Sequence, residues 1–333
     1  MPASTKRWRP WRRQADMQVR FWGTRGSLPA ALTARSVREK LIAALVAGSG
    51  KALDTPEKAA AFADSLPFAA TNTFGGNSSC VEVRSEGAGR MLLDMGSGAR
   101  PAAGDALREL KGKPGEFHVL MSHLHWDHIM GFPFFTPAYI PGHTIRVYGC
   151  HKELEHAFRR QQDAPSFPVG FAMLGARIEF TVLEPGRAYD IAGYKVTAKE
   201  QAHGGDSYGY RVERNGKALI YSTDSEHKLE NPDATQGFVD FFRRADLVIF
   251  DAMYSLADSI SVKEDWGHSS NIVGVELCQL AGAKHLVLFH HEPAYDDATI
   301  ERVWRETERL EEITRGEHPV KVTAAYDGLE VTL

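Results

Sequence analysis

The sequence predicts an α/β protein in which two sheets are packed between layers of helices. Strand-like apolar segments occur in both halves of the chain, and segments with apolar residues at helical spacing lie between them. This mixture favours sheets covered by helices, because each sheet and each helix must bury its apolar face against another layer. The 333 residues, 43% hydrophobic and 25% charged, suffice for a large core, and a single domain of this length is common.

The order of the predicted elements suggests an insertion near the N-terminus. The first strand, 18–22, is followed by helical patterns at 33–47 and from the start signal Thr55-Pro56-Glu57 to before Pro67. We therefore predict one domain over 17–333 with a helical insertion at about 30–70, which is a candidate lid or homodimer contact. The other expected strands are 80–83, 91–93, 117–122, 145–148, 178–183, 194–199, 208–213, 217–221, 246–250, 285–289 and 320–325, and the other expected helices are 101–110, 151–161, 235–243, 270–281 and 296–312.

Charge separates the N-terminal residues from the rest of the chain. Residues 1–20 hold six Lys or Arg against one Asp, a local charge of +5, whereas the whole chain has a net charge of −4. We predict that 1–16 is a basic, disordered tail; the alternative is a tryptophan-bearing anchor for nucleic acid or membrane. The remaining body is acidic and offers few phosphate contacts, so no long nucleic acid is expected as a partner.

The cellular compartment is predicted from what the chain contains. No apolar run of 18 or more residues exists, which excludes a membrane span, and the basic N-terminus has no apolar signal core. Three scattered cysteines, Cys80, Cys150 and Cys278, argue against a disulfide framework and fit a reducing cytoplasm.

The motif His-Leu-His-Trp-Asp-His at 123–128 directly follows a predicted strand. In extended chain, side chains two residues apart point the same way, so His123 and His125 can face one metal ion. A turn must follow, which directs Asp127 and His128 to a second ion nearby. Imidazole and carboxylate are ligands of zinc and also suit manganese or iron. The alternative is a chance histidine cluster in a solvated loop, which the surrounding apolar residues disfavour.

Three further ligand-type residues each follow a predicted strand: His203, Asp224 and His290. Functional groups of α/β folds gather at such strand ends. Each residue alone would be read as a surface or capping residue. Together with the first motif they form a pattern.

This order of residues resembles the metallo-β-lactamase superfamily from about Met17 to the C-terminus. The resemblance implies a four-layer αββα sandwich with two metal ions at one edge of the sheets. By motif position, Asp224 would bridge an ion held by His123, His125 and His203 and an ion held by Asp127, His128 and His290. His291 is the rival of His290 for the last position.

Asp94, in the segment Asp94-Met95-Gly96-Ser97-Gly98, matches the first motif of the same family. There it resembles a carboxylate that orients the metal-binding loop without binding the metal itself. An ordinary strand-to-turn aspartate is the alternative.

Within the superfamily, three features resemble the RNase Z and phosphodiesterase branch. Asp224 occupies the bridging position, and the first motif has both Asp127 and His128. The segment Trp266-Gly267-His268-Ser269-Ser270 resembles the motif whose histidine meets substrate phosphate, and Asp251 resembles its acidic partner. His268 could otherwise cap the helix that opens at Ser269 or Ser270.

The function predicted from these features is a binuclear metal-dependent phosphodiesterase that acts on a cyclic nucleotide or a similar small diester. Asp127, His268 and Asp251 are its candidate catalytic residues, and zinc is the favoured metal. The alternatives are an acyl hydrolase of lactonase or β-lactamase type, an RNase Z-like nuclease and a metal-dependent binding domain without turnover. RNase Z enzymes grip tRNA with a protruding arm and a basic surface, neither of which is evident between these motifs.

Two interpretations concern residues beside the motifs. Aromatic residues that include Trp126 and Phe132 are expected to build the core and a wall of the substrate pocket. Arg25, in the turn after the first strand, is expected at the surface, with contact to an anionic substrate as the alternative.

Overall fold

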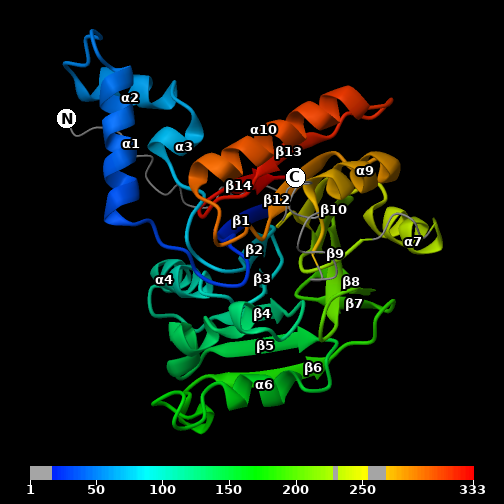
Figure 1. Cartoon of the computed structure of the whole chain (residues 1–333). Coiled ribbons are helices and arrows are strands. Elements are labelled where there is room, and N and C mark those ends of the chain that lie inside the picture. The colour runs from blue at the N-terminus through cyan, green and yellow to red at the C-terminus, as the bar shows by residue number, and fades with distance from the viewer. Residues whose placement is uncertain (1–16, 228–231, 254–267) are drawn as a thin grey trace.

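The computed structural model describes residues 17–227, 232–253 and 268–333. The predicted tail 1–16 and the first part of the Trp266–Ser270 segment lie outside these residues. Two seven-stranded sheets form the centre of the structure (Figure 1), with the strand orders β14-β1-β2-β3-β4-β5-β6 and β13-β12-β11-β10-β9-β8-β7. The strands of the first sheet are β1 Gln18–Gly23, β2 Cys80–Arg84, β3 Arg90–Leu93, β4 Glu116–Leu120, β5 Thr144–Gly149, β6 Arg177–Val182 and β14 Glu330–Thr332.

The second sheet has antiparallel and parallel halves. Strands β7 to β10 pair in antiparallel fashion, whereas β10 to β13 are parallel. Parallel strands end at a common edge, which brings the residues that follow them together. The strands are β7 Ala188–Ile191, β8 Tyr194–Gln201, β9 Ser207–Arg214, β10 Lys217–Ser222, β11 Leu247–Asp251, β12 His285–Phe289 and β13 Lys321–Ala324.

Helices cover the outer face of each sheet. Helices α4 (Ala99–Leu110) and α6 (Leu154–Arg160) pack on the first sheet, and α7 (Pro232–Phe242), α9 (Asn271–Ala281) and α10 (Asp297–Thr314) lie on the second. Three apolar clusters follow from this layering, one between the sheets and one beneath each helical layer. Along β11, Ile249 joins the central cluster and its neighbours Val248 and Phe250 join the outer one, as the twofold periodicity of a strand requires. The predicted four-layer α/β sandwich is confirmed.

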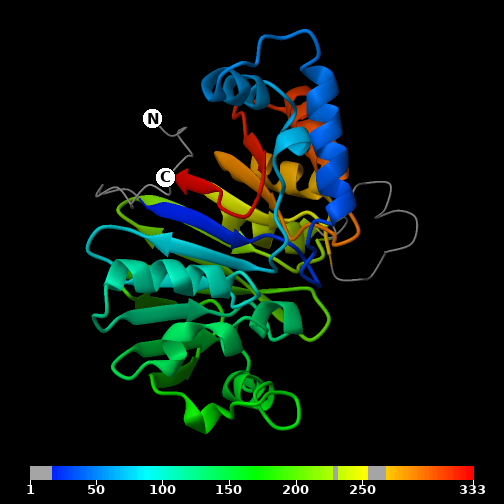
Figure 2. The same cartoon turned by 90° about the vertical axis from the view of Figure 1, so that its left-hand side faces the viewer.

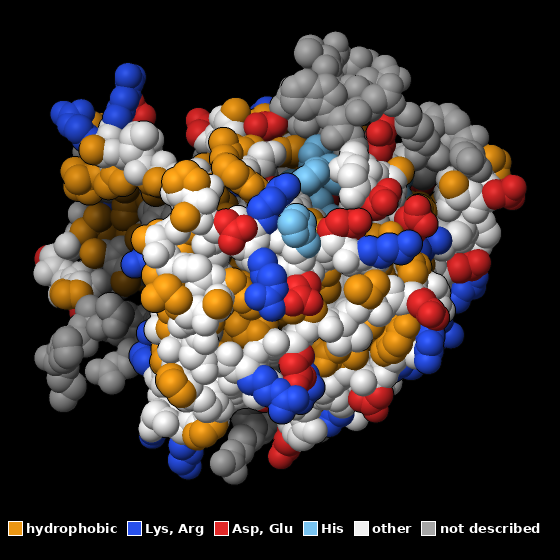
Figure 3. Space-filling model, turned by 90° about the horizontal axis from the view of Figure 1, so that it is seen from below, with side chains coloured by type: hydrophobic (Ala, Val, Ile, Leu, Met, Phe, Trp, Pro, Cys, Tyr) orange, Lys and Arg blue, Asp and Glu red, His pale blue; other side chains and the backbone are white. Residues whose placement is uncertain are grey.

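Helices α1 (Ala34–Ala47), α2 (Pro56–Asp64) and α3 (Phe68–Thr71) connect β1 to β2. Helix α1 contacts α3, which packs against α10, and α1 and α2 stand at the edge of the molecule (Figures 1 and 2). No residue of α1 is buried, and hydrophobic side chains are exposed on this projection, which lies at the left of Figure 3. Among the described residues, no helix is both long enough and apolar enough to cross a membrane.

The observed elements differ from the predicted ones mainly where they are short. Strands β7 and β14 and helices α3 and α5 (Trp126–Ile129) are not predicted, and neither are the 3-10 turns at Phe132–Phe134, Thr136–Tyr139 and Phe171–Met173. Elements of three or four residues give too few repeats for a period to be recognised.

Candidate metal centre

The first motif lies in the loop between β4 and the short helix α5. His123 follows the buried end of β4 and is itself buried, His125 is exposed, and Asp127 and His128 are buried in the first turn of α5. The loop before α5 turns the chain, so that the two pairs of side chains point to neighbouring positions. This arrangement is the one that the spacing predicts.

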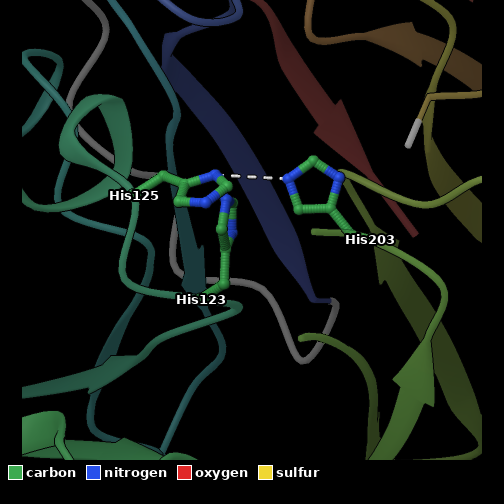
Figure 4. Close-up of side chains that lie close together, drawn as sticks. All are labelled: His123, His125 and His203. Carbon is green, nitrogen blue, oxygen red and sulfur yellow. Dashed lines mark hydrogen bonds between the residues drawn. The ribbon is translucent and has the colours of Figure 1, made fainter. Parts of the chain in front are cut away.

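His123, His125 and His203 form the first cluster (Figure 4). One nitrogen from each ring lies within 4.8 Å of the others, and Nε2 of His203 is 3.2 Å from Nδ1 of His125. His203 comes from the segment after β8 in the second sheet, whereas the other two follow β4 in the first sheet. The cluster therefore spans the edges of both sheets.

Asp127, His128 and His290 form the second cluster. Oδ2 of Asp127 lies 3.1 Å from Nε2 of His128 and 3.3 Å from Nε2 of His290. The two imidazole Nε2 atoms are 3.3 Å apart, and all three residues are buried. Three donor atoms thus lie close together. Two come from α5, and the third comes from His290, which directly follows β12.

Asp224 lies between the two clusters, two residues after the end of β10. Its Oδ1 is 3.7 Å from Nε2 of His123 and 3.8 Å from Nε2 of His203. Its Oδ2 is 3.2 Å from Nε2 of His128 and 3.3 Å from Nε2 of His290. Each carboxylate oxygen therefore faces a different cluster, which is the geometry that a bridging ligand requires.

The donor set fits a pair of divalent cations. Nε2 of His123 is buried and has no hydrogen-bond partner among the described residues, a costly state unless an ion binds it. Burial, with the neighbouring histidines, keeps the pKa of His123 and His125 below the ordinary value, which favours the neutral rings that bind metals. The nitrogen-rich set of five histidines and two aspartates suits zinc.

Three of the residues at this edge have a left-handed backbone. The φ angles are 62° at Asp94, 49° at Asp224 and 60° at His290. Residues other than glycine rarely adopt this conformation, and it is concentrated at functional sites. At His290 it turns the side chain toward Gly26, where an added Cβ would lie only 2.6 Å from the imidazole ring. The turn after β1 thus needs glycine because it packs against this ring.

Asp94 follows β3 and lies beside the two clusters of candidate metal ligands. It contacts them through other side chains. Its Oδ2 lies 2.7 Å from Nδ1 of His128 and accepts hydrogen bonds from the hydroxyls of Ser122 and Tyr221, each at 2.7 Å. The same serine hydroxyl is 3.0 Å from Nδ1 of His123. The carboxylate is completely buried and fixes which nitrogen of His128 faces the cluster.

Asp251 and His268 form a pair beside the clusters. Nδ1 of His268 lies 2.7 Å from Oδ2 of Asp251, and its ring stacks at 5.2 Å on that of His290. Burial alone would lower the pKa of His268, but the adjacent carboxylate of Asp251 raises it to about 9. The contact with Asp251 therefore favours the protonated, cationic form of the His268 ring.

A family model described as β-lactamase superfamily domain matches residues 90–291, which contain all of these site residues. The chain belongs to the β-lactamase superfamily. The resemblance that the motifs indicate is thereby confirmed.

Similar proteins lie within this superfamily. A ribonuclease Z from Acaryochloris marina is 23% identical over 284 residues, which cover 67% of this chain and 86% of the relative. The metallo-β-lactamase fold protein YhfI from Bacillus subtilis has a TM-score of 0.64 at 17% identity, with 96% of this chain and all of YhfI covered. Yeast PDE1 has a TM-score of 0.62 at 11% identity, with 96% and 100% covered. These comparisons agree with the prediction of a metal-dependent hydrolase.

Two residues, Trp126 and Arg25, differ in burial from what the sequence predicts. Trp126 is 75% exposed and contributes nothing to the core, because the turn into α5 directs it outward. Arg25 is buried, not at the surface, and its guanidinium donates to the carbonyl oxygens of Gly75, Glu292 and Tyr295. Arg25 therefore ties three loops together and does not reach the metal clusters.

His291 is directed away from the superfamily site. Its Nε2 lies 2.8 Å from the carbonyl oxygen of Ala325, and the ring packs against Phe74. His290, in contrast, brings its Nε2 to within 3.3 Å of both Asp127 and His128. The geometry favours His290.

Proposed function

We propose that this chain is a two-metal hydrolase that cleaves a small phosphodiester. The proposal rests on the Asp251–His268 pair, in which a carboxylate holds an imidazole 2.7 Å away and beside the two clusters that Asp224 joins, so that the protonated ring is favoured. Such a cation can meet charge that develops on a leaving oxygen. The names ribonuclease Z and PDE1 of similar proteins support phosphoester chemistry, although they do not identify the substrate.

Seven residues would hold the metals. His123, His125 and His203 would bind one ion, and Asp127, His128 and His290 the other, with Asp224 shared. Two bound zinc ions would neutralise a phosphodiester anion and lower the pKa of bound water from about 15.7 to about 7.

Asp127 is suited to orient the attacking water. Burial would raise the pKa of its carboxyl, but His128 and His290 hold it well below the ordinary value. The carboxylate therefore stays ionised, and an oxygen that does not bind a metal ion can accept a hydrogen bond from water. Asp127 therefore acts as a positioning acceptor.

His268 is suited to protonate the leaving group. Nδ1 is engaged by Asp251, so the proton on Nε2 can pass to the departing oxygen as the P–O bond breaks. The need for this proton depends on the leaving group, because an alkoxide is a much stronger base than p-nitrophenolate.

This dependence provides the test. Metal-loaded protein should hydrolyse bis-p-nitrophenyl phosphate and a 3′,5′-cyclic nucleotide, and Asp127→Ala should abolish both activities. His268→Ala should lower kcat for the cyclic nucleotide by about 10²–10⁴-fold but change the p-nitrophenyl reaction much less. The matched control is His156→Ala, which replaces an exposed histidine on α6. An equal loss with both substrates would exclude the general-acid role.

Competing functions give different results in the same assays. Hydrolysis of a chromogenic lactam or lactone without any diester cleavage would identify an acyl hydrolase. Cleavage restricted to tRNA precursors would identify an RNase Z-like nuclease. Fully metallated protein that turns over none of these substrates would be a binding domain.

A further inference from the structure

A second polar site lies at the opposite end of the second sheet. A cavity of about 1110 Å³ is bordered by the turn between β9 and β10 and by the segments that lead into β11, β12 and β13. The parallel strands run from this cavity toward the metal clusters. Strands of five or six residues are about 17–20 Å long, so the cavity is separate from the candidate metal centre.

The lining of the cavity has more cations than its carboxylates can neutralise. Seven lysine and arginine residues line it, but only two acidic residues do, and one of the seven, Arg243, pairs with Asp240 outside the lining. Glu213 is shared, because its carboxylate oxygens lie 3.1 Å from Nζ of Lys195 and 3.1 Å from a guanidinium nitrogen of Arg211. One negative charge thus faces two positive ones.

The second carboxylate is shared in the same way. Oδ1 of Asp246 lies 2.8 Å from Nζ of Lys284 and 3.7 Å from Nζ of Lys217. Its other oxygen accepts a hydrogen bond from the backbone nitrogen of Ala218, which fixes the carboxylate at the floor of the cavity. Lys284 remains 67% exposed and can turn toward a ligand.

Two arginines of the lining have no carboxylate to balance their charge. Arg214 donates to the carbonyl oxygens of Gly193 and Glu86, which leave its positive charge intact. Arg244 is exposed, and within the part of the chain that the structure describes no carboxylate lies within ion-pair distance of it. The cavity is therefore strongly electropositive in a chain whose net charge is −4.

We propose that this cavity binds a small polyphosphate anion. Lysine and arginine side chains form charge-assisted hydrogen bonds with phosphate oxygens, and the volume exceeds that of a nucleoside triphosphate. Leu280, 58% exposed, and Pro319 provide an apolar wall for a base. Because the cations are confined to one hollow and do not form a stripe, the site suits a compact anion better than a long nucleic acid.

The test compares the binding of three probes to the full-length protein by isothermal titration calorimetry. The probes are tripolyphosphate, ATP and a 20-nucleotide single-stranded RNA. The double variant Arg244→Gln/Lys284→Gln removes two cavity cations, and Lys58→Gln/Lys113→Gln removes two exposed lysines elsewhere. Thermal melting monitors folding in each variant.

Each result supports or overturns the proposal. The cavity variant should weaken tripolyphosphate and ATP binding by about tenfold or more, whereas the control should change it less than about twofold. Tighter binding of ATP than of tripolyphosphate would identify a nucleotide as the ligand, and equal binding would identify the phosphate chain alone. Unchanged polyphosphate binding in the folded cavity variant, or an effect of the cavity variant on RNA alone, would overturn the proposal.

Discussion

Oδ2 of Asp94 lies 2.7 Å from Nδ1 of His128, and this contact links the end of β3 to the candidate metal centre. The same carboxylate receives the hydroxyls of Ser122 and Tyr221. Asp94→Asn would turn an amide hydrogen toward these donors and release the His128 ring. We expect metal affinity to fall by about 10–100-fold, measured by competition with a chromogenic chelator.

The matched control for this substitution is Tyr221→Phe, which removes one hydrogen bond to Asp94 but keeps its charge and the His128 contact. It should weaken metal binding much less than Asp94→Asn. Equal losses would mean that Asp94 acts through packing of the buried edge and not by orienting His128.

His290 and His291 provide a direct test of the ligand assignment. His290→Ala should reduce the metal content by about one equivalent per chain, because it removes one donor of a three-residue cluster. His291→Ala should leave the metal content unchanged. It should instead lower the free energy of unfolding by about 1–3 kcal/mol, because the partner carbonyl of Ala325 stays buried without its hydrogen bond. Elemental analysis and urea denaturation separate the two outcomes, and the reverse pattern would show that His291 is the ligand.

The candidate metal ligands can be located in the sequence because most of them follow apolar strands that are easily recognised. His290 comes directly after the apolar run Leu286–Phe289, and Asp224 follows β10, so the common edge of a sheet brings them together. These arguments need only a period and a strand end.

Features that depend on turn conformation are not predictable in this way. The left-handed backbone at Asp94, Asp224 and His290 is imposed by the surrounding packing, and the residue types at these positions do not indicate it. The same holds for the outward direction of Trp126 and for the burial of Arg25, whose partners come from two loops far apart in sequence. Tyr221 looks like an ordinary strand residue until the second sheet packs it against Asp94.

Trp126 is expected to hold an aromatic part of the substrate. It is 75% exposed, and its neighbours in the chain, His125 and Asp127, are both candidate metal ligands. Stacking on an aromatic side chain stabilises a bound base by about 1–3 kcal/mol. Trp126→Ala should therefore raise KM for a cyclic nucleotide by about 5–100-fold and leave kcat nearly unchanged. A diester without a ring, such as a glycerophosphodiester, is the control substrate, and an equal rise in KM for it would contradict the stacking role.

We expect the folded protein to lose stability in acid because of His285, which lies at the start of β12. Burial, with a smaller effect of Lys321, lowers its pKa to about 4, below the value of about 6.5 in unfolded chains. The unfolded state therefore binds a proton more readily, and stability that is fully present above pH 6.5 is lost as the pH falls toward 4. Between pH 8 and pH 5 this single group should cost about 2 kcal/mol.

Substitution of His285 isolates this contribution. His285→Gln keeps a polar atom near the Thr323 hydroxyl, 2.9 Å from Nε2, but does not titrate. Its free energy of unfolding should fall about 2 kcal/mol less than that of the original protein between pH 8 and pH 5. The exposed His318, replaced by Gln, should follow the original protein. Parallel pH profiles for all three proteins would rule out this account.

The exposed face of α1 predicts self-association. Val37, Leu41 and Leu45 recur every four residues on one side of the helix and are 53%, 58% and 66% exposed. A stripe of this kind can pair with its own copy across a twofold axis, because the same surface serves both partners. We expect a dimer of about twice 36.9 kDa by light scattering, and Leu41→Glu/Leu45→Glu should give monomers. Ile313→Glu, which alters an exposed apolar residue of α10, should leave the dimer intact. A monomeric mass for the unaltered protein at high concentration would exclude this contact.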